Sequence, residues 1–146
     1  MLQNFDNNGI MYLIMKSEQL VIFEDNKDIR ALLELNALLR GHMVIKVADN
    51  LEMANVVLHE IEKGALTPHP TFGITDYNLR EGDHSCSDGR YVAERLLHLG
   101  IPAVGFSAVK PDENEPDIPV AAYIDKAVPS SVDILFNAIE ELRRAA

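Results

Sequence analysis

Short apolar runs alternate with stretches of helical periodicity along most of this chain, and this alternation constrains the fold more than any other feature. Five apolar runs lead into polar residues, and they span residues 20–24, 43–47, 71–75, 101–106 and 120–124. After four of them, apolar residues recur every three or four positions and predict helices. Alternation of strands and helices implies parallel strands joined by right-handed crossovers. The sequence therefore predicts an α/β fold with a doubly wound, five-stranded parallel sheet.

Residue types at the ends of the predicted helices support their boundaries. Asn26 and Asn50 are suited to cap the first two helices. Ser87 or Asp88 is suited to cap the third, and a glycine follows each of these helices, as is common where helices end. The stretch 109–119 instead contains three prolines and five acidic or amide residues. A loop, not a helix, is therefore predicted between the fourth and fifth strands.

Composition limits the classes of protein to which the chain can belong. Its 146 residues are enough for one domain, and 47% of them are apolar. The net charge of -10 argues against nucleic acid or an anionic membrane as a partner, and no apolar stretch reaches the roughly 20 residues of a membrane span. With Cys86 as the single cysteine, no internal disulfide can form. We therefore expect a cytoplasmic protein.

The first 18 residues differ from the rest of the chain. Turn-forming residues dominate positions 4–9, and the apolar run 10–15 predicts a short strand or a docking segment. No basic residue precedes this run and no small-residue cleavage site follows it, so no signal peptide is predicted. We expect an N-terminal extension at 1–18, which would add an edge strand or mediate homodimerisation, and one domain at 19–146.

Acidic residues stand where two of the apolar runs end. Glu24 and Asp25 end the first run, and Asp76 follows the third. Because the carboxyl ends of parallel strands share one edge of a sheet, these three carboxylates are expected to meet in one crevice. At about 5 Å apart they would repel by roughly 3 kcal/mol per pair at an effective dielectric constant near 20, so the cluster would recruit a proton or a cation. Oxygen ligands without a nearby His or Cys favour Mg2+.

Two further strand ends supply groups that suit a phosphoryl ligand. Ser107 follows the fourth run, and Lys126 lies two residues beyond the fifth. A lysine ammonium binds a phosphoryl oxygen as a point charge, and a serine hydroxyl can hydrogen-bond another. Asp76 is then suited to be the nucleophile that takes up the phosphoryl group covalently.

The ordered set of these residues resembles the receiver domain of two-component response regulators, over about residues 19–144. The resemblance implies a flavodoxin-like sheet with strand order 2-1-3-4-5. The family usually has a full helix between the fourth and fifth strands, which residues 109–119 do not favour. The positions that match the family are, in chain order, Glu24, Asp25, Asp76, Asn78, Ser107, Tyr123 and Lys126.

The resemblance also implies roles for these residues. Glu24, Asp25 and Asp76 match the metal-binding acids, and the backbone carbonyl of Asn78 would complete the Mg2+ site. Asp76 matches the phosphoacceptor, with Ser107 and Lys126 as its catalytic partners.

Tyr123 matches the aromatic residue that, together with the hydroxyl at Ser107, changes position on activation. Family members receive phosphate from a histidine kinase or a histidine phosphotransfer protein and signal to a downstream protein. We therefore expect a stand-alone signalling receiver, not a conventional enzyme. We further expect the loop 109–119 to become ordered on phosphorylation.

Three features depart from the family pattern and keep alternatives open. Ala127 stands where proline usually follows the lysine, and the loop after Asp76 is longer than usual. The third departure, the missing helix, leaves open a binding module whose acidic site is never phosphorylated. A small phosphatase of the haloacid-dehalogenase type would also use a strand-end Asp with Mg2+, but it requires a second acid two residues later. Asn78 occupies that position.

Overall fold

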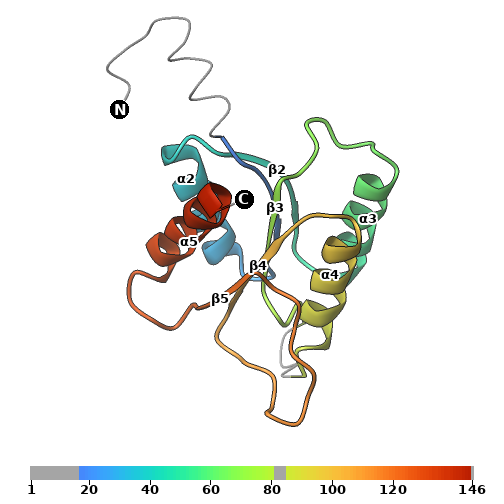
Figure 1. The fold of residues 1–146 in the computed structure, drawn as a ribbon, viewed down its shortest axis with the longest axis vertical. Coiled ribbons are helices and arrows are strands. Elements are labelled where there is room, and N and C mark those ends of the chain that lie inside the picture. Colours follow the sequence, from blue (N-terminus) through green and yellow to red (C-terminus); the bar gives the residue numbers. More distant parts are fainter. Residues whose placement is uncertain (1–16, 81–84, 146) are drawn as a thin grey trace, which may run out of the picture.

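A five-stranded parallel sheet forms the centre of the computed structural model, which describes residues 17–80 and 85–145 (Figure 1). The strand order is β2-β1-β3-β4-β5, and every pairing is parallel. The predicted fold class and strand order are therefore confirmed. The strands are β1 (Gln19–Phe23), β2 (Met43–Ala48), β3 (Phe72–Thr75), β4 (Ala103–Ser107) and β5 (Ala122–Asp125).

Helices cover both faces of this sheet (Figure 1). On one face lie α2 (Lys27–Leu39) and α5 (Ser131–Ala145), and on the other lie α3 (Leu51–Glu62) and α4 (Ser87–His98).

The central strand β1 supplies side chains to both of the resulting hydrophobic cores. Leu20 and Ile22 pack with residues of α2 and α5, whereas Val21 and Phe23 pack with residues of α3 and α4. All four side chains are fully buried, and burial of each contributes about 1.5–3 kcal/mol. Because successive side chains of a strand point to opposite faces, one continuous apolar run suffices to build both cores.

The predicted helix ends are confirmed for α2 and α3. The amide oxygens of Asn26 and Asn50 accept hydrogen bonds from backbone N–H groups in the first turns of these helices. The helix-ending glycines at positions 41, 64 and 100 have φ angles of 80°, 71° and 77°. Glycine adopts this left-handed region without the steric cost that a Cβ brings.

The predicted cap of α4 is wrong. The N-cap residue is Cys86, which has φ 60° and makes no side-chain capping bond. The Asp88 carboxylate instead accepts hydrogen bonds from the Leu79 backbone N–H at 3.2 Å and from the Arg80 guanidinium at 3.0 Å. It is only 2% exposed. The Asp88 side chain therefore stabilises the loop before α4, whereas the local sequence predicts that it caps the helix.

No helix forms anywhere in residues 108–121, all of which the structure describes, as the prolines predicted. Arg90 of α4 holds this segment by donating to the Pro116 carbonyl oxygen at 2.8 Å and pairing with Glu115 at 3.4 Å. Ile118 is buried and joins the core on the α3 and α4 face. The segment is therefore a loop with defined anchors on the domain.

The strands that flank this loop begin two residues later than predicted, at 103 instead of 101 and at 122 instead of 120. Pro102 has no N–H to donate to a ladder. The Val120 N–H donates to the Ile118 carbonyl oxygen at 2.8 Å in a local turn, so it is not available to β4.

The predicted extension, including the apolar run 10–15, lies outside the described residues except for positions 17 and 18. The division of the chain at residue 19 therefore stays a prediction. In the ranges that the structure describes, no helix has both the length and the apolar character that a membrane crossing requires.

A buried histidine at the amino edge of the sheet should make the stability of the fold sensitive to acid. The His42 Nδ1 accepts a hydrogen bond from the Glu18 N–H at 3.0 Å, and its Nε2 lies 3.5 Å from the Glu140 Oε1. Burial lowers the pKa of His42 below 6.5, although Glu140 partly opposes this shift. The fold therefore favours neutral His42, and the stability that this provides is present above the unfolded pKa and lost as the pH falls below about 6.5.

Urea unfolding at pH 7.5 and pH 5.5 tests this prediction. We expect the parent to lose stability between these values and His42→Gln to lose less, because it has no imidazole to protonate. His98→Gln, a change at an exposed histidine, serves as the matched control and should follow the parent. Equal losses in His42→Gln and in the parent would contradict the assignment.

Candidate functional site

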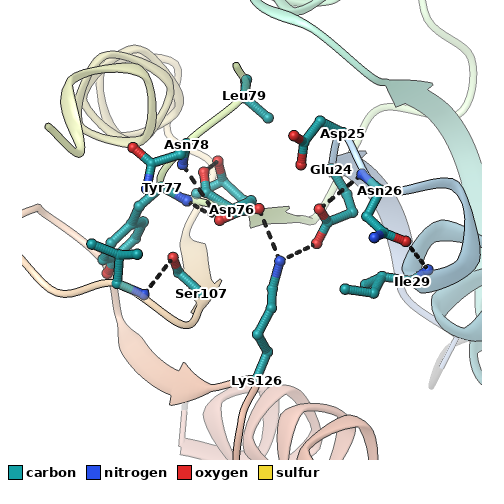
Figure 2. Close-up of polar contacts among 12 residues, drawn as sticks. Glu24, Asp25, Asn26, Ile29, Asp76, Tyr77, Asn78, Leu79, Ser107 and Lys126 are labelled. Atoms are coloured by element: carbon teal, nitrogen blue, oxygen red, sulfur yellow. Dashed lines mark hydrogen bonds and ion pairs between the residues drawn. The ribbon is translucent and has the colours of Figure 1, made fainter. Parts of the chain in front are cut away.

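The register of the sheet places the predicted site residues side by side at its carboxyl edge. Phe23 of β1 lies opposite Thr75 of β3, and Thr75 lies opposite Gly105 of β4. Glu24 and Asp76 are the residues that follow Phe23 and Thr75, so both leave the sheet at the same level. Figure 2 shows that the carboxylates of Glu24 and Asp76 both point toward the ammonium group of Lys126.

Three carboxylates form a cluster at this edge. Glu24, Asp25 and Asp76 each offer an oxygen, and these oxygens all lie within 4.8 Å of one another. Glu24 and Asp76 are 1% and 8% exposed, whereas the Asp25 side chain is accessible to solvent. The structure thus brings together all three acids that the sequence singled out, with one of them open to an incoming ligand.

Lys126 reaches this cluster from the residue after β5 (Figure 2). Its Nζ donates to the Glu24 Oε1 at 2.7 Å and to the Asp76 Oδ2 at 2.8 Å. These charge-assisted bonds are short, as expected for an ammonium that bridges two carboxylates. The predicted lysine therefore stands at the centre of the site.

Burial and the excess of carboxylates over ammonium groups together shift the pKa values in this cluster. Burial, reinforced by the charge of Asp76, raises the pKa of Glu24 to about 8, although Lys126 opposes the shift. For Lys126, burial acts to lower the pKa, but the carboxylates of Glu24 and Asp76 outweigh it and the pKa is raised. The site thus holds a charged lysine and an excess of acid. Such a donor set, made of oxygens only, fits a hard divalent cation.

The two oxygens of Asp76 are held by different groups. Oδ1 accepts the Tyr77 backbone N–H at 2.7 Å and, more weakly, the Asn78 N–H at 3.4 Å, while Oδ2 accepts from Lys126. The Asn78 side-chain oxygen accepts the Cys86 N–H at 3.2 Å, so this side chain serves the loop. The metal-ligand role of the Asn78 backbone carbonyl remains a prediction.

Ser107 and Tyr123 lie on the side of the site that faces the 108–121 loop. The Ser107 Oγ accepts the Val109 N–H at 3.2 Å, and the Ser107 carbonyl oxygen accepts the Tyr123 hydroxyl at 2.7 Å. Figure 2 shows Ser107 beside Asp76 and on the opposite side from Glu24. The two predicted switch residues are therefore in direct contact with each other.

Two polar residues that support the site were missed in the sequence analysis. The Arg30 guanidinium donates to the carbonyl oxygens of Glu24 and Asp25 at 3.0 and 2.8 Å, and it thereby holds the turn that carries these acids. Asp88 organises the loop that follows Asp76. Both side chains form hydrogen bonds with backbone groups. Charged residues are common in the first turn of a helix, so the sequence alone does not indicate either of these contacts.

The comparisons with known proteins give a match at the level of structure. No protein-family model matches this sequence, and no curated protein matches it. The signal receiver domain of a modulated diguanylate cyclase from Desulfovibrio desulfuricans G20 is similar with a TM-score of 0.65 at 21% identity, over 86% of this chain and 92% of that one. For a CheY-like response regulator receiver domain protein from Methanospirillum hungatei JF-1 the TM-score is 0.63 at 20% identity, over 88% and 95%.

A third similar structure belongs to a longer protein. The response regulator PhyR from Brucella abortus has a TM-score of 0.65 at 21% identity and matches 88% of this chain. The match covers 50% of the PhyR chain, so the present chain spans half the length of that protein. At these identities the comparisons establish the fold. The chain has the fold of response-regulator receiver domains.

Proposed function

We propose that this protein accepts a phosphoryl group on Asp76 in an Mg2+-dependent reaction and transmits this modification through contacts with other proteins. The observation that carries the proposal is the convergence of three carboxylates and Lys126 at the carboxyl edge of a receiver-type sheet. Strand-end acids that only solvate loops would not need to be buried around a lysine. A site with excess acid and one bridging ammonium suits a cation and a phosphoryl group together.

Glu24, Asp25 and Asp76, together with the Asn78 backbone carbonyl, are the proposed ligands of Mg2+. When bound, Mg2+ would neutralise charge on the transferring phosphoryl group. The solvent-accessible carboxylate of Asp25 would be open to an incoming Mg2+ ion, and the buried Glu24 would add a second acidic group beside it.

Asp76 is the proposed nucleophile. One of its carboxylate oxygens forms a bond to phosphorus as the phosphorus–nitrogen bond of a phosphohistidine donor breaks, and the released imidazole takes up a proton. The Tyr77 N–H and the Lys126 ammonium hold the two oxygens of Asp76, so the carboxylate is oriented before the donor arrives. After transfer, Lys126 would bind one phosphoryl oxygen and the Ser107 hydroxyl would donate to another.

The chemistry of this transfer defines the partners. The donor would be a histidine kinase or a histidine phosphotransfer protein, and the recipient of the signal would be a protein that distinguishes the phosphorylated from the unphosphorylated form. This role is that of a signalling protein that catalyses only its own phosphorylation and dephosphorylation.

Intact-mass measurement after incubation with acetyl phosphate tests the proposal. We expect the chain to gain one phosphate in the presence of Mg2+ and none when EDTA removes the metal. Absence of any uptake would instead favour the binding module that is never phosphorylated. Phosphatase activity is not favoured, because the position of the second acid is held by Asn78, whose side chain is bonded to the Cys86 N–H.

The raised pKa of Glu24 predicts that Mg2+ binding depends on pH. Since the pKa of Glu24 is raised to about 8, protons and Mg2+ compete for this carboxyl at neutral pH. The apparent affinity for Mg2+ should therefore rise with pH by up to about tenfold per unit below pH 8 and level off above it.

Calorimetric titration with Mg2+ at pH 6.5, 7.5 and 8.5 measures this dependence. Glu24→Gln removes the titrating group, so it should bind more weakly at high pH and show a flatter profile. A parent profile as flat as that of Glu24→Gln would show that Glu24 does not exchange its proton for the metal.

A further inference from the structure

Tyr77, the residue after the proposed phosphoacceptor, has a buried ring that fills a slot between β4 and α4. The side chain is 2% exposed. A Cβ at Gly105 of β4 would overlap the Tyr77 hydroxyl oxygen and lie 2.7 Å from Cε1 and Cζ, and a Cβ at Gly89 of α4 would overlap the Tyr77 Cα and lie 2.8 Å from Cδ1. Two glycines from different elements therefore leave the space that this ring occupies.

The backbone of Tyr77 ties this ring to Asp76. The Tyr77 N–H donates to the Asp76 Oδ1 at 2.7 Å, and the Tyr77 carbonyl oxygen accepts the Gly89 N–H at 2.9 Å. A change in the charge or position of the Asp76 carboxylate thus acts directly on the peptide that carries the ring.

The ring of Tyr77 contacts the predicted switch residue Tyr123. Their ring centroids are 5.5 Å apart, with an interplanar angle of 39°. Tyr123 in turn donates to the Ser107 carbonyl oxygen, and the Lys110 ammonium lies 4.8 Å from the centre of its ring. A continuous set of contacts therefore runs from Asp76 through two tyrosine rings to the 108–121 loop.

The position of Tyr77 also restricts where Tyr123 can move. Tyr123 and Gly105 are partners in the register of β4 and β5, and side chains at paired positions lie next to each other on one face of a sheet. Because Gly105 has no side chain, the space next to Tyr123 on this face of the sheet is free for another residue. The ring of Tyr77 occupies that space. An inward rotation of Tyr123 over Gly105 would therefore meet the Tyr77 ring.

We propose that Tyr77 is a positioning residue that couples the state of Asp76 to Tyr123 and the 108–121 loop. The inference rests on the proposed function, since it concerns how phosphorylation of Asp76 is transmitted. Formation of the acyl phosphate changes the acceptor of the Tyr77 N–H bond, the ring shifts in its slot, and Tyr123 and the loop follow.

Fluorine NMR of the full chain labelled with 3-fluorotyrosine tests this coupling, because the chain contains only four tyrosines. Single Tyr→Phe variants assign the signals. Addition of beryllofluoride and Mg2+, which mimic the phosphoryl group, should shift the signals of Tyr77 and Tyr123 and leave in place that of Tyr91, whose hydroxyl bonds to Asn55 of α3. Hydrogen exchange in residues 108–121 should slow at the same time.

Tyr77→Leu separates coupling from phosphorylation. It removes the ring but keeps the backbone N–H that bonds the Asp76 Oδ1, and phosphate uptake from acetyl phosphate is measured in parallel to show that the variant still loads the site. The Tyr123 signal and the exchange of the 108–121 loop should no longer respond to beryllofluoride. Tyr77→Phe keeps the ring and should restore both responses, which a loss caused by general destabilisation would not predict.

A second pair of variants tests the slot without phosphorylation. Gly105→Ala places a Cβ against the Tyr77 ring, so it should lower the urea midpoint and shift the Tyr123 signal in the resting protein. In a Tyr77→Ala background the obstruction is absent, and Gly105→Ala should have a much smaller effect on the midpoint. If Gly105→Ala lowers the urea midpoint equally in both backgrounds, the Tyr77 ring does not depend on the space over Gly105, and the proposed coupling through Tyr77 is wrong.

The outcomes distinguish this inference from the proposed function. If the parent takes up phosphate and the loop of Tyr77→Leu still responds as in the parent, the coupling through Tyr77 is wrong and the phosphoacceptor assignment stands. If the parent takes up no phosphate under any of these conditions, the proposed function fails, and the inference that depends on it fails as well.

Discussion

Asp76→Asn is expected to take up no phosphate from acetyl phosphate under conditions in which the parent gains one per chain. The amide keeps the size of the side chain and one of its two oxygens, which can accept either from Lys126 or from the Tyr77 N–H. It lacks the anionic oxygen that attacks phosphorus, so the loss should be complete and not partial. The folded variant is incubated with acetyl phosphate and Mg2+, and the mass of the intact, denatured chain then shows directly whether a phosphate was added.

The variant should remain folded, which makes a loss of uptake interpretable. Asp76 adds to the repulsion that raises the pKa of Glu24, so removing its charge relieves this repulsion and offsets the loss of the ion pair with Lys126, and we expect a thermal midpoint close to that of the parent. Asp49→Asn is a matched control, because Asp49 is an exposed acid that follows β2 at the same edge of the sheet. It should gain phosphate as the parent does. Phosphate on folded Asp76→Asn would place the acceptor elsewhere.

The residues of the acidic site were predictable because strand ends are visible in a sequence. An apolar run that stops at a charged residue marks where a buried strand leaves the core, and parallel pairing then carries Glu24, Asp76, Ser107 and Lys126 to the same edge. The long-range contact between Lys126 and Glu24, 102 positions apart, thus follows from two local signals and one topological rule.

Contacts that depend on loop geometry were not predictable in this way. Asp88 binds the Leu79 N–H only because the loop folds back on α4, and capping statistics assign it to the helix instead. Tyr77 is polar enough to suit an exposed loop, yet its ring is buried over Gly105. Nothing in the spacing of these residues indicates that two glycines in different elements leave room for one ring. Tertiary packing decides both cases.

Asp25→Asn is expected to weaken Mg2+ binding by about thirtyfold and to slow phosphorylation at limiting Mg2+ to a similar extent. Glu24 and Asp76 are both hydrogen-bonded to Lys126. Among the described residues, no side chain donates a hydrogen bond to the Asp25 carboxylate, which leaves it available to a cation. A unit charge about 4 Å from a divalent ion contributes about 2 kcal/mol even at the dielectric constant of water, which corresponds to about thirtyfold in affinity.

Asp28→Asn is the control that separates coordination from general electrostatics. It makes the same change in net charge three residues away, in the exposed first turn of α2. Since screening weakens the interaction of exposed charges that are not in contact, its Mg2+ affinity should stay within about threefold of the parent. Saturating Mg2+ should restore the phosphorylation rate of Asp25→Asn, because the nucleophile and Lys126 are intact. A rate that stays low at saturation would mean that Asp25 acts on the transfer itself, and equal losses in both variants would remove it from the metal site.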